Sequence, residues 1–401
     1  MSQPWLKKKV NALELYTIDV IYGRRAGAGP ALYGAFLQVL SWLFSAAAQT
    51  RLWLYRKRIL HDQPLGCLVV VVGNLTVGGT GKTPVVEKFA RALRDRGRKV
   101  AILSRGYKSK SVPLWQRFWW RITHVEAPAP RIVSDGTTVL LDSESAGDEP
   151  YMLANNLKDV VVLVDVDRVK SGRFAIKEFK TDTLLLDDGL QYLRLKHRLD
   201  IVLIDRQAPF GNEYLLPRGT LREPPRNLRR ASYIFITKCT GEPNDDLIAR
   251  IRKYNRTAEI IECAHKPLHL QNAFSSEQLP LETLRGAFVG SLCGIAAPES
   301  FDDGLRKLGA RLELLKHYTD HHRYSEAELQ TFINRCLRRD LSMIVTTEKD
   351  AVRFPRLMNP EVPIYFLRVE IEILSGHESW EHCVARICQP QPMLSPERFF
   401  S

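Results

Sequence analysis

The sequence has few cysteines, no internal repeat and no stretch of low complexity. Its 401 residues include seven scattered cysteines and no CxxC pair. This spacing predicts neither a structural zinc site nor a disulfide framework, and it fits a reducing cytosol. Because 45% of the residues are hydrophobic and 26% are charged, the composition is that of a globular protein, not a disordered or fibrous one.

Acidic residues are scarce at the N-terminus, where only Glu14 and Asp19 accompany nine lysines and arginines within residues 1–60. More than half of the formal net charge of +13 therefore lies in this segment. Such an excess indicates an anionic partner, which can be a nucleic acid, a membrane surface or a phosphorylated substrate. Since the chain contains no recognised nucleic-acid-binding motif, we expect no nucleic-acid partner.

Charge is absent altogether from Ala26 to Gln49. A helix over residues 31–50 has enough apolar residues to span a bilayer, for which about 20 are needed. Its small and polar residues form one stripe, which consists of Gly34, Gln38, Ser41, Ser45 and Gln49. We therefore predict a helix that lies in the interface of an anionic membrane, in preference to a full span; a core helix is the alternative.

Beyond residue 60, continuous apolar runs alternate with helical patterns. The expected strands are 67–72, 100–103, 160–166, 183–186, 201–204, 233–236, 287–290, 343–346 and 364–369. The expected helices are 85–96, 149–156, 168–177, 300–308 and 325–338. This alternation predicts an α/β fold with a parallel sheet that helices cover on both faces. Trp115, Trp119 and Trp120 are interleaved with Arg117 and Arg121 within residues 107–134, a segment that we interpret as a membrane-contacting element, a nucleic-acid-stacking element or an inserted hairpin.

A glycine-rich loop follows the first expected strand, in the sequence VGNLTVGGTGKTP at 72–84. Strand, loop and helix in this order are the context of a phosphate-binding P-loop, whose glycines let backbone N–H groups point at phosphates. The predicted nucleotide-binding residues are Thr76, Val77, Gly78, Gly79, Thr80, Gly81, Lys82 and Thr83. Lys82 would reach the β- and γ-phosphates, and the Thr83 hydroxyl would bind Mg²⁺. The general P-loop pattern has a glycine where this chain has Thr76.

Two adjacent acids, Asp187 and Asp188, end the apolar run at 183–186. P-loop enzymes place an acid at a strand end to hold Mg²⁺ or its waters. Ligands of open α/β sheets gather at the carboxyl ends of strands. We therefore predict that these acids take part in metal binding.

Several further polar motifs follow the expected strands in order. They are LSRGY at 103–107, AGDEP at 146–150, DDGLQ at 187–191, GNEYLLPRGTLREP at 211–224, DHHRYS at 320–325 and TEKDAV at 347–352. With the glycine-rich loop, they resemble the tetraacyldisaccharide 4′-kinases, the lipid A 4′-kinases of Gram-negative bacteria. The resemblance covers about residues 65–370. It implies transfer of the ATP γ-phosphate to the 4′-hydroxyl of a tetraacylated glucosamine disaccharide 1-phosphate, with Mg²⁺, at the cytoplasmic face of the inner membrane.

The resemblance also implies roles for individual residues. Asp148 becomes the candidate general base, and His321 the residue that pairs with it and orients it. Lys82 and Thr83 become nucleotide and Mg²⁺ contacts; Asp187, Asp188 and Glu223 become acids at the metal, and Asn74, Gln191 and Arg222 become further active-site groups. We expect a membrane-associating segment at 1–60, a P-loop kinase domain at 61–240, and a smaller α/β domain at 241–401 that closes the active-site cleft. We expect no obligate protein partner.

Two departures from the family pattern leave open how the nucleotide is bound in detail and which acceptor is selected. Tyr192 stands where a histidine is usual, and Gly294–Glu299 reads GIAAPE in place of GIGNPE. The strongest rival interpretation is a membrane-associated P-loop ATPase switch of the division and partitioning type. Those proteins have a lysine before the paired glycines, where this chain has Val77. A soluble nucleoside or sugar kinase is the second rival, but it leaves the apolar N-terminus unexplained.

Overall fold

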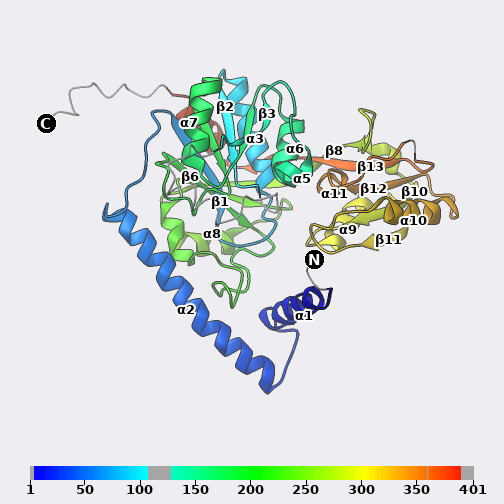
Figure 1. Ribbon diagram of the computed structural model, residues 1–401, viewed down its shortest axis with the longest axis horizontal. Helices are drawn as coiled ribbons and strands as arrows, with labels where there is room; N and C mark the ends of the chain where they lie inside the picture. Colours follow the sequence, from blue (N-terminus) through cyan, green and yellow to red (C-terminus); the bar gives the residue numbers. More distant parts are fainter. Residues whose placement is uncertain (1–3, 107–127, 359, 390–401) are drawn as a thin grey trace. The chain divides into compact units, whose positions relative to one another are not determined.

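The computed structural model describes residues 4–106, 128–358 and 360–389 (Figure 1). It divides into two units. The first unit consists of Met1–Pro64, Val71–Lys82 and Asp188–Ala264, and the second of Leu65–Val70, Thr83–Asp187 and His265–Ser401. Both combine buried strands with helices, which confirms the predicted α/β class. The predicted boundaries at residues 60 and 240 stay predictions.

The first unit contains a group of neighbouring strands in the order β8-β7-β6-β1. Their bounds are β1 Leu68–Asn74, β6 Leu199–Asp205, β7 Tyr233–Thr237 and β8 Glu259–Asn272, with helix α8 at Asp245–Arg252 and the 3-10 helix η1 at Pro225–Arg230. Strand β7 is parallel to both β6 and β8. Every residue of β1, β6 and β7 is buried, as their continuous apolar runs predict.

Two helices precede these strands in the first unit, α1 at Pro4–Ile21 and α2 at Ala28–Arg56. The long helix α2 in Figure 1 contains the helix expected over residues 31–50 and extends it at both ends. It is long and apolar enough to cross a membrane by length and composition, and 17% of its most apolar window is buried. The predicted stripe faces the protein: Gly34 and Ser41 are buried, and the Ser41 hydroxyl donates to the Leu215 carbonyl at 3.0 Å.

The N-terminal part of the second unit has strands in the order β5-β2-β4-β3. The strands are β2 Val100–Ser104, β3 Arg131–Asp135, β4 Val161–Val164 and β5 Thr183–Asp187, and the helices are α3 Lys82–Asp95, α5 Ser143–Ala146, α6 Asp148–Asn156 and α7 Arg168–Phe179. Strand β2 is parallel to β4 and β5, whereas β3 is antiparallel to β4. The carboxyl ends of the parallel strands lie at one edge of the sheet, and Gly147 directly precedes α6.

The C-terminal part of the second unit has strands in the order β11-β10-β12-β13-β8, and β9 pairs with β8. The elements are β9 Gln278–Leu279, η2 Leu281–Leu284, β10 Phe288–Cys293, α9 Pro298–Lys307, β11 Arg311–His317, α10 Glu326–Leu337, β12 Met343–Thr347, α11 Glu348–Ala351, β13 Ile364–Ser375 and α12 His377–Cys388. Apolar side chains pack on both faces: Phe332 of α10 joins one core cluster, and Leu305 of α9 joins the other. Packing on both faces is consistent with the burial of nearly every residue of β10 and β12.

Each apolar run and each helical pattern of the sequence analysis is an element of the structure, with ends that differ by a few residues. The sequence analysis missed the strands β3, β8, β9 and β11, and the helices α1, α5, α8, α11 and α12. Strand β11 reads RLELLKH and is only partly buried, so its charged residues interrupt the apolar run that marked the other strands. The tryptophans at 115, 119 and 120 lie outside the described residues, so the three interpretations of that segment stay open.

Candidate functional site

The glycine-rich loop leaves β1 at Asn74 and enters α3 at Lys82. Gly78 and Gly81 have φ values of +114° and +77°, a backbone region that side chains with a Cβ rarely adopt. Strand β7 fixes the loop from one side, because the buried Thr237 hydroxyl donates to the Thr80 carbonyl at 2.8 Å. The loop is therefore curled by glycines and anchored to the strands, as a phosphate-binding loop requires.

Lys82 lies between two oxygen-bearing side chains. Its Nζ is 3.3 Å from Asn74 Oδ1 and 3.8 Å from Asp188 Oδ1. Asp188 has a left-handed backbone with φ +52°, a conformation that non-glycine residues adopt at some cost and that is frequent at functional sites. Arg222 Nη1 donates to both oxygens of Asp188, at 2.8 and 2.7 Å. The structure thus brings together three predicted site residues from three separate motifs around the Lys82 ammonium group.

Gln191 and Glu223 lie beside this group. The Gln191 side-chain amide donates to the Asn74 carbonyl at 3.2 Å and to Glu223 Oε1 at 3.1 Å. Both carboxylate oxygens of Glu223 also accept from Arg230, at 3.0 and 2.8 Å, and Asn227 donates to Oε2 at 2.6 Å. Because hydrogen-bond donors of the protein contact both carboxylate oxygens of Glu223, we interpret Glu223 as a residue that holds the start of the glycine-rich loop in place. Its predicted role at the metal stays a prediction.

The residues of the loop fit a nucleotide triphosphate with its metal ion. The Thr80 hydroxyl is buried and makes no hydrogen bond within the described residues, so it can donate to a phosphate oxygen. Mg²⁺ prefers oxygen ligands, the chemical type that the Thr83 hydroxyl and the acids at the end of β5 offer. In the second unit, Asp187 is buried and lies 3.2 Å from the Ser104 hydroxyl. The roles of Thr83, Asp187 and Asp188 as metal ligands stay predictions.

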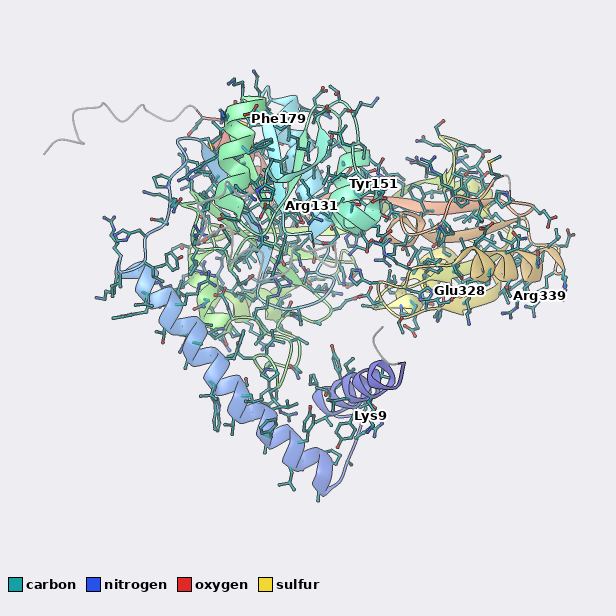
Figure 2. The ribbon with its side chains drawn as sticks, viewed as in Figure 1. Lys9, Arg131, Tyr151, Phe179, Glu328 and Arg339 are labelled. Carbon is teal, nitrogen blue, oxygen red and sulfur yellow. The ribbon has the colours of Figure 1, made fainter. Side chains whose placement is uncertain are left out.

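The second unit brings Asp148 and His321 together from motifs far apart in the sequence. Asp148 is the first residue of α6, the helix that also carries Tyr151 in Figure 2, and its carboxylate is near the positive end of the helix dipole. The distance from Asp148 Oδ2 to His321 Nδ1 is 3.1 Å. His321 has φ +63°, again a left-handed backbone at a residue with a Cβ. A carboxylate held beside an imidazole can accept a proton from a hydroxyl group.

Arginines surround the Asp148 carboxylate. Arg353 Nε donates to Oδ2 at 2.9 Å, and Arg323 Nη2 donates to Oδ1 at 3.3 Å. Burial raises the pKa of the Asp148 carboxyl, but the hydrogen bond with His321 and the charges of Arg353 and Arg323 outweigh burial, so this pKa lies below its usual value. Asp148 is therefore ionised at neutral pH, the form that a base needs.

The sequence analysis did not select Arg353, Arg323 or Lys349. Lys349 Nζ pairs with Glu149 at 2.7 Å, next to Asp148. Lys349 falls inside the TEKDAV motif, Arg323 inside DHHRYS, and Arg353 directly after TEKDAV, so the motifs were the available signal. A motif gives the position of a residue in the chain, whereas the partner of a buried arginine follows only from the fold.

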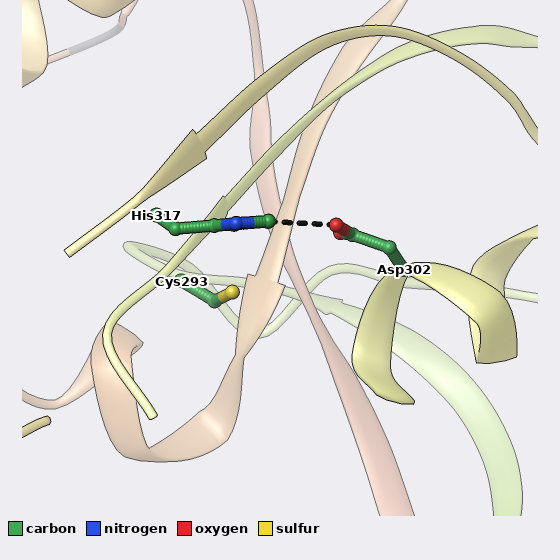
Figure 3. A group of neighbouring side chains, drawn as sticks. All are labelled: Cys293, Asp302 and His317. Atoms are coloured by element: carbon green, nitrogen blue, oxygen red, sulfur yellow. Dashed lines mark hydrogen bonds and ion pairs between the residues drawn. The ribbon is translucent and has the colours of Figure 1, made fainter. Parts of the chain in front are cut away.

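A separate group of side chains, Cys293, Asp302 and His317, has ligand atoms within 4.8 Å of one another (Figure 3). Cys293 and His317 are register partners on β10 and β11, and Asp302 is on α9. Both Asp302 oxygens are engaged, by the Ser291 hydroxyl at 2.5 Å and by His317 Nε2 at 2.7 Å. Burial raises the pKa of the Cys293 thiol to about 12, whereas a thiolate is the form that binds metals. We assign these contacts to the packing of α9 on the two strands.

Comparisons with known proteins indicate one family of kinases. The family model described as tetraacyldisaccharide-1-P 4′-kinase matches residues 33–389. The tetraacyldisaccharide 4′-kinase of Anaeromyxobacter dehalogenans (strain 2CP-C) is 38% identical over 374 residues, which cover 92% of this chain and 94% of that relative. The corresponding protein of Syntrophus aciditrophicus (strain SB) is 36% identical over 362 residues, 88% of this chain and 92% of its own length.

Among solved structures, LpxK from Aquifex aeolicus in complex with ATP matches with a TM-score of 0.68 and 27% identity, over 88% of this chain and 99% of that chain. The MinD cell division protein of the same organism matches with a TM-score of 0.29 and 14% identity over 49% of this chain. This second likeness is too weak to support the division-type ATPase alternative.

Proposed function

Since the chain belongs to the tetraacyldisaccharide-1-P 4′-kinase family, we propose that it transfers the γ-phosphate of ATP to the 4′-hydroxyl of a tetraacylated glucosamine disaccharide 1-phosphate. The observation that carries the proposal is the presence of two chemically distinct groups of side chains. Lys82, on a glycine-curled loop, is suited to an anionic phosphate chain. Asp148, paired with His321, is suited to a hydroxyl group.

In the first unit, residues bind and neutralise phosphate. Phosphoryl transfer depends mainly on positioning and on stabilisation of charge on the transferred group. The Lys82 ammonium group and the backbone N–H groups of the loop supply positive potential for the β- and γ-phosphates. Arg222, which holds Asp188, keeps that acid in a fixed orientation beside Lys82. When bound, Mg²⁺ would supply further charge neutralisation at the phosphates, and Asp188 is the predicted metal ligand that this unit contains.

In the second unit, Asp148 acts on the acceptor. Its carboxylate takes the proton of the 4′-hydroxyl, and the sugar oxygen forms a bond to the γ-phosphorus while the bond from that phosphorus to the β–γ bridging oxygen breaks. ADP leaves with the electron pair of the broken bond. General-base assistance of this kind contributes about 10²–10⁴-fold. The lowered pKa of Asp148 makes it a weak base, which suffices because the loose transition state of phosphoryl transfer requires little early proton removal.

Helix α2 supports a place at the membrane, where an acylated substrate resides. Leu32, Phe36, Val39 and Leu43 follow the helical repeat and are all exposed, while Ser41 faces the protein. An exposed apolar face with basic residues at both ends of the segment is typical of a helix that lies in an anionic membrane interface. We propose that the protein binds the cytoplasmic face of the bacterial inner membrane through this helix.

The test is a reaction of the purified protein with ATP and the disaccharide 1-phosphate in mixed micelles. We expect a product that is heavier by one phosphoryl group, with a new phosphomonoester that ³¹P NMR places at the 4′ position. The matched control is an acceptor that lacks the 4′-hydroxyl, with which ATP turnover falls to background. ATP hydrolysis that proceeds equally with both acceptors would contradict the proposal and favour an ATPase switch.

A further inference from the structure

Arg353 is the best-anchored cation near the candidate base. Its side chain is fully buried, although it carries a charge. Arg353 Nη1 donates to the Gly294 carbonyl and to Asp350 Oδ1, each at 3.2 Å. Asp350 is also fully buried; it accepts from the Tyr324 hydroxyl at 2.9 Å and from the Thr347 hydroxyl at 2.6 Å. A buried arginine held on one side by a carbonyl and a carboxylate presents its remaining donors in a fixed direction.

Those remaining donors point at the Asp148–His321 pair. Arg353 Nε is 2.9 Å from Asp148 Oδ2, and Nη2 is 3.1 Å from His321 Nδ1, the same nitrogen that lies 3.1 Å from Asp148 Oδ2. If Nδ1 carries a proton, it donates to Asp148 and cannot accept from Arg353. If Nδ1 carries no proton, it accepts from Arg353 and makes no hydrogen bond to Asp148. The bond from Arg353 Nε to Asp148 is present in both cases.

We propose that Arg353 is the positioning residue that fixes the Asp148 carboxylate, independently of the tautomer of His321. This inference rests on the proposed kinase function and adds a residue to its acceptor-activating side. His321 then modulates a carboxylate whose place is already set by Arg353. The charge of Arg353 also keeps Asp148 ionised, so that the pair works at a lower pH than an unassisted carboxylate would.

The charged groups around Asp148 define the expected pH effect. On α6, the neighbouring Glu149 pairs with Lys349 of α11. The loop before α10 contributes Arg323 and His321, and Asp320 lies 4.0 Å from His321 Nε2. The turn after α11 contributes Arg353, which shares its charge with Asp350. Burial raises the pKa of Asp148, and the charge of Arg353 counteracts this effect. Removal of Arg353 therefore raises the pKa of Asp148 and moves the acidic limb of the plot of kcat/KM against pH to higher pH.

The experiment compares Arg353→Met, Arg353→Lys and the matched control Arg339→Met in kcat, in KM for ATP and in the dependence of kcat/KM on pH. Arg339 is an exposed arginine after α10 and is labelled in Figure 2. We expect Arg353→Met to lower kcat by about 10²-fold, the cost of a misplaced reacting group, with an unchanged KM for ATP and a shifted acidic limb. Arg353→Lys keeps the positive charge but lacks the planar guanidinium group. We therefore expect kcat to fall, while the acidic limb of the pH profile stays at the wild-type pH. Arg339→Met should behave as the wild type.

Circular dichroism and ATP binding show whether each variant is folded. A folded Arg353→Met protein with wild-type kcat and pH profile would overturn the proposal. Should Arg353→Met fail to fold, Arg353→Lys decides, because wild-type kcat in that variant would show that the guanidinium geometry is not needed. Absence of acceptor-dependent turnover in the wild type and in Arg339→Met alike would count against the proposed function instead.

Discussion

At the scale of the residue, Lys82 is the cation that we propose to bind the phosphates of the nucleotide. Its ammonium group lies near Asn74 and Asp188, and Arg222 fixes Asp188 in turn. The motifs that contain Lys82, Asp148 and His321 could be selected from the sequence because glycine, acid and histidine occur in recognisable local patterns. The buried partner Arg353 could not, since its pairing with Asp148 depends on how distant segments fold together.

Replacement of Lys82 by alanine removes this cation without removing a large side chain from the core. We expect kcat to fall by about 10²- to 10³-fold, as observed when a group that stabilises transition-state charge is deleted. The measurement is the steady-state rate of acceptor phosphorylation, with Lys158→Ala as the control because Lys158 is an exposed lysine. A Lys82→Ala protein with the kcat of the control would remove Lys82 from the mechanism.

At the scale of the element, the polar stripe of α2 could be predicted from the sequence, whereas its contacts could not. The sequence predicts the stripe, but only the structure shows that Gly34 and Ser41 of that stripe face the segment around Leu215 and Arg218 of the same unit. The opposite face, with Leu32 and Leu43, is exposed. Strands β8 and β11 escaped the sequence analysis for a related reason, since partly buried strands alternate apolar with polar residues and resemble neither a buried run nor a helix.

Replacement of Leu43 by glutamate tests the exposed face of α2. An apolar side chain that enters a lipid phase contributes about 1.5–3 kcal/mol, so we expect at least a tenfold weaker partition into anionic vesicles. The measurement is co-sedimentation with vesicles that contain phosphatidylglycerol. Thr50→Glu, which adds the same charge at an exposed position of the same helix, should bind more tightly than Leu43→Glu. Equal binding by both variants and the wild type would exclude this face as the membrane contact.

At the scale of the whole molecule, a buried ion network joins elements that are far apart in the sequence. Arg368 of β13 pairs with Glu87 of α3, the helix that follows the phosphate loop, and with Glu348 of α11, at 2.7 Å in the second case. Asn156 of α6 donates to Glu348 at 2.6 Å. Within the second unit, the network therefore joins α3, α6, α11 and β13. Closure of a cleft by residues 241–401 stays a prediction.

Replacement of Arg368 by methionine removes the cation that Glu87 and Glu348 share, although Glu87 keeps its ion pair with Arg91 at 2.6 Å. Loss of one partner from a buried ion pair costs about 3–5 kcal/mol, and we expect a decrease of this size in the free energy of unfolding in urea. Burial raises the pKa of Glu87 even beside Arg368, so the variant should recover part of its stability as the pH falls and the carboxyls become protonated. The triple variant with Glu87→Gln and Glu348→Gln should also recover stability at neutral pH. An Arg368→Met protein as stable as the wild type would show that the network contributes little.

In the proposed mechanism, one group of side chains holds the nucleotide while Asp148 accepts the proton of the acceptor hydroxyl. The most direct test is transfer of label from ATP radiolabelled at the γ-phosphate to the disaccharide 1-phosphate, followed by thin-layer chromatography, for the wild type and for Asp148→Asn at saturating ATP. We expect a labelled lipid with the wild type, and a rate lower by about 10²–10⁴-fold for Asp148→Asn with ATP affinity unchanged. Equal labelling by both proteins, or ATP consumption by the wild type without a labelled lipid, would contradict the proposed mechanism.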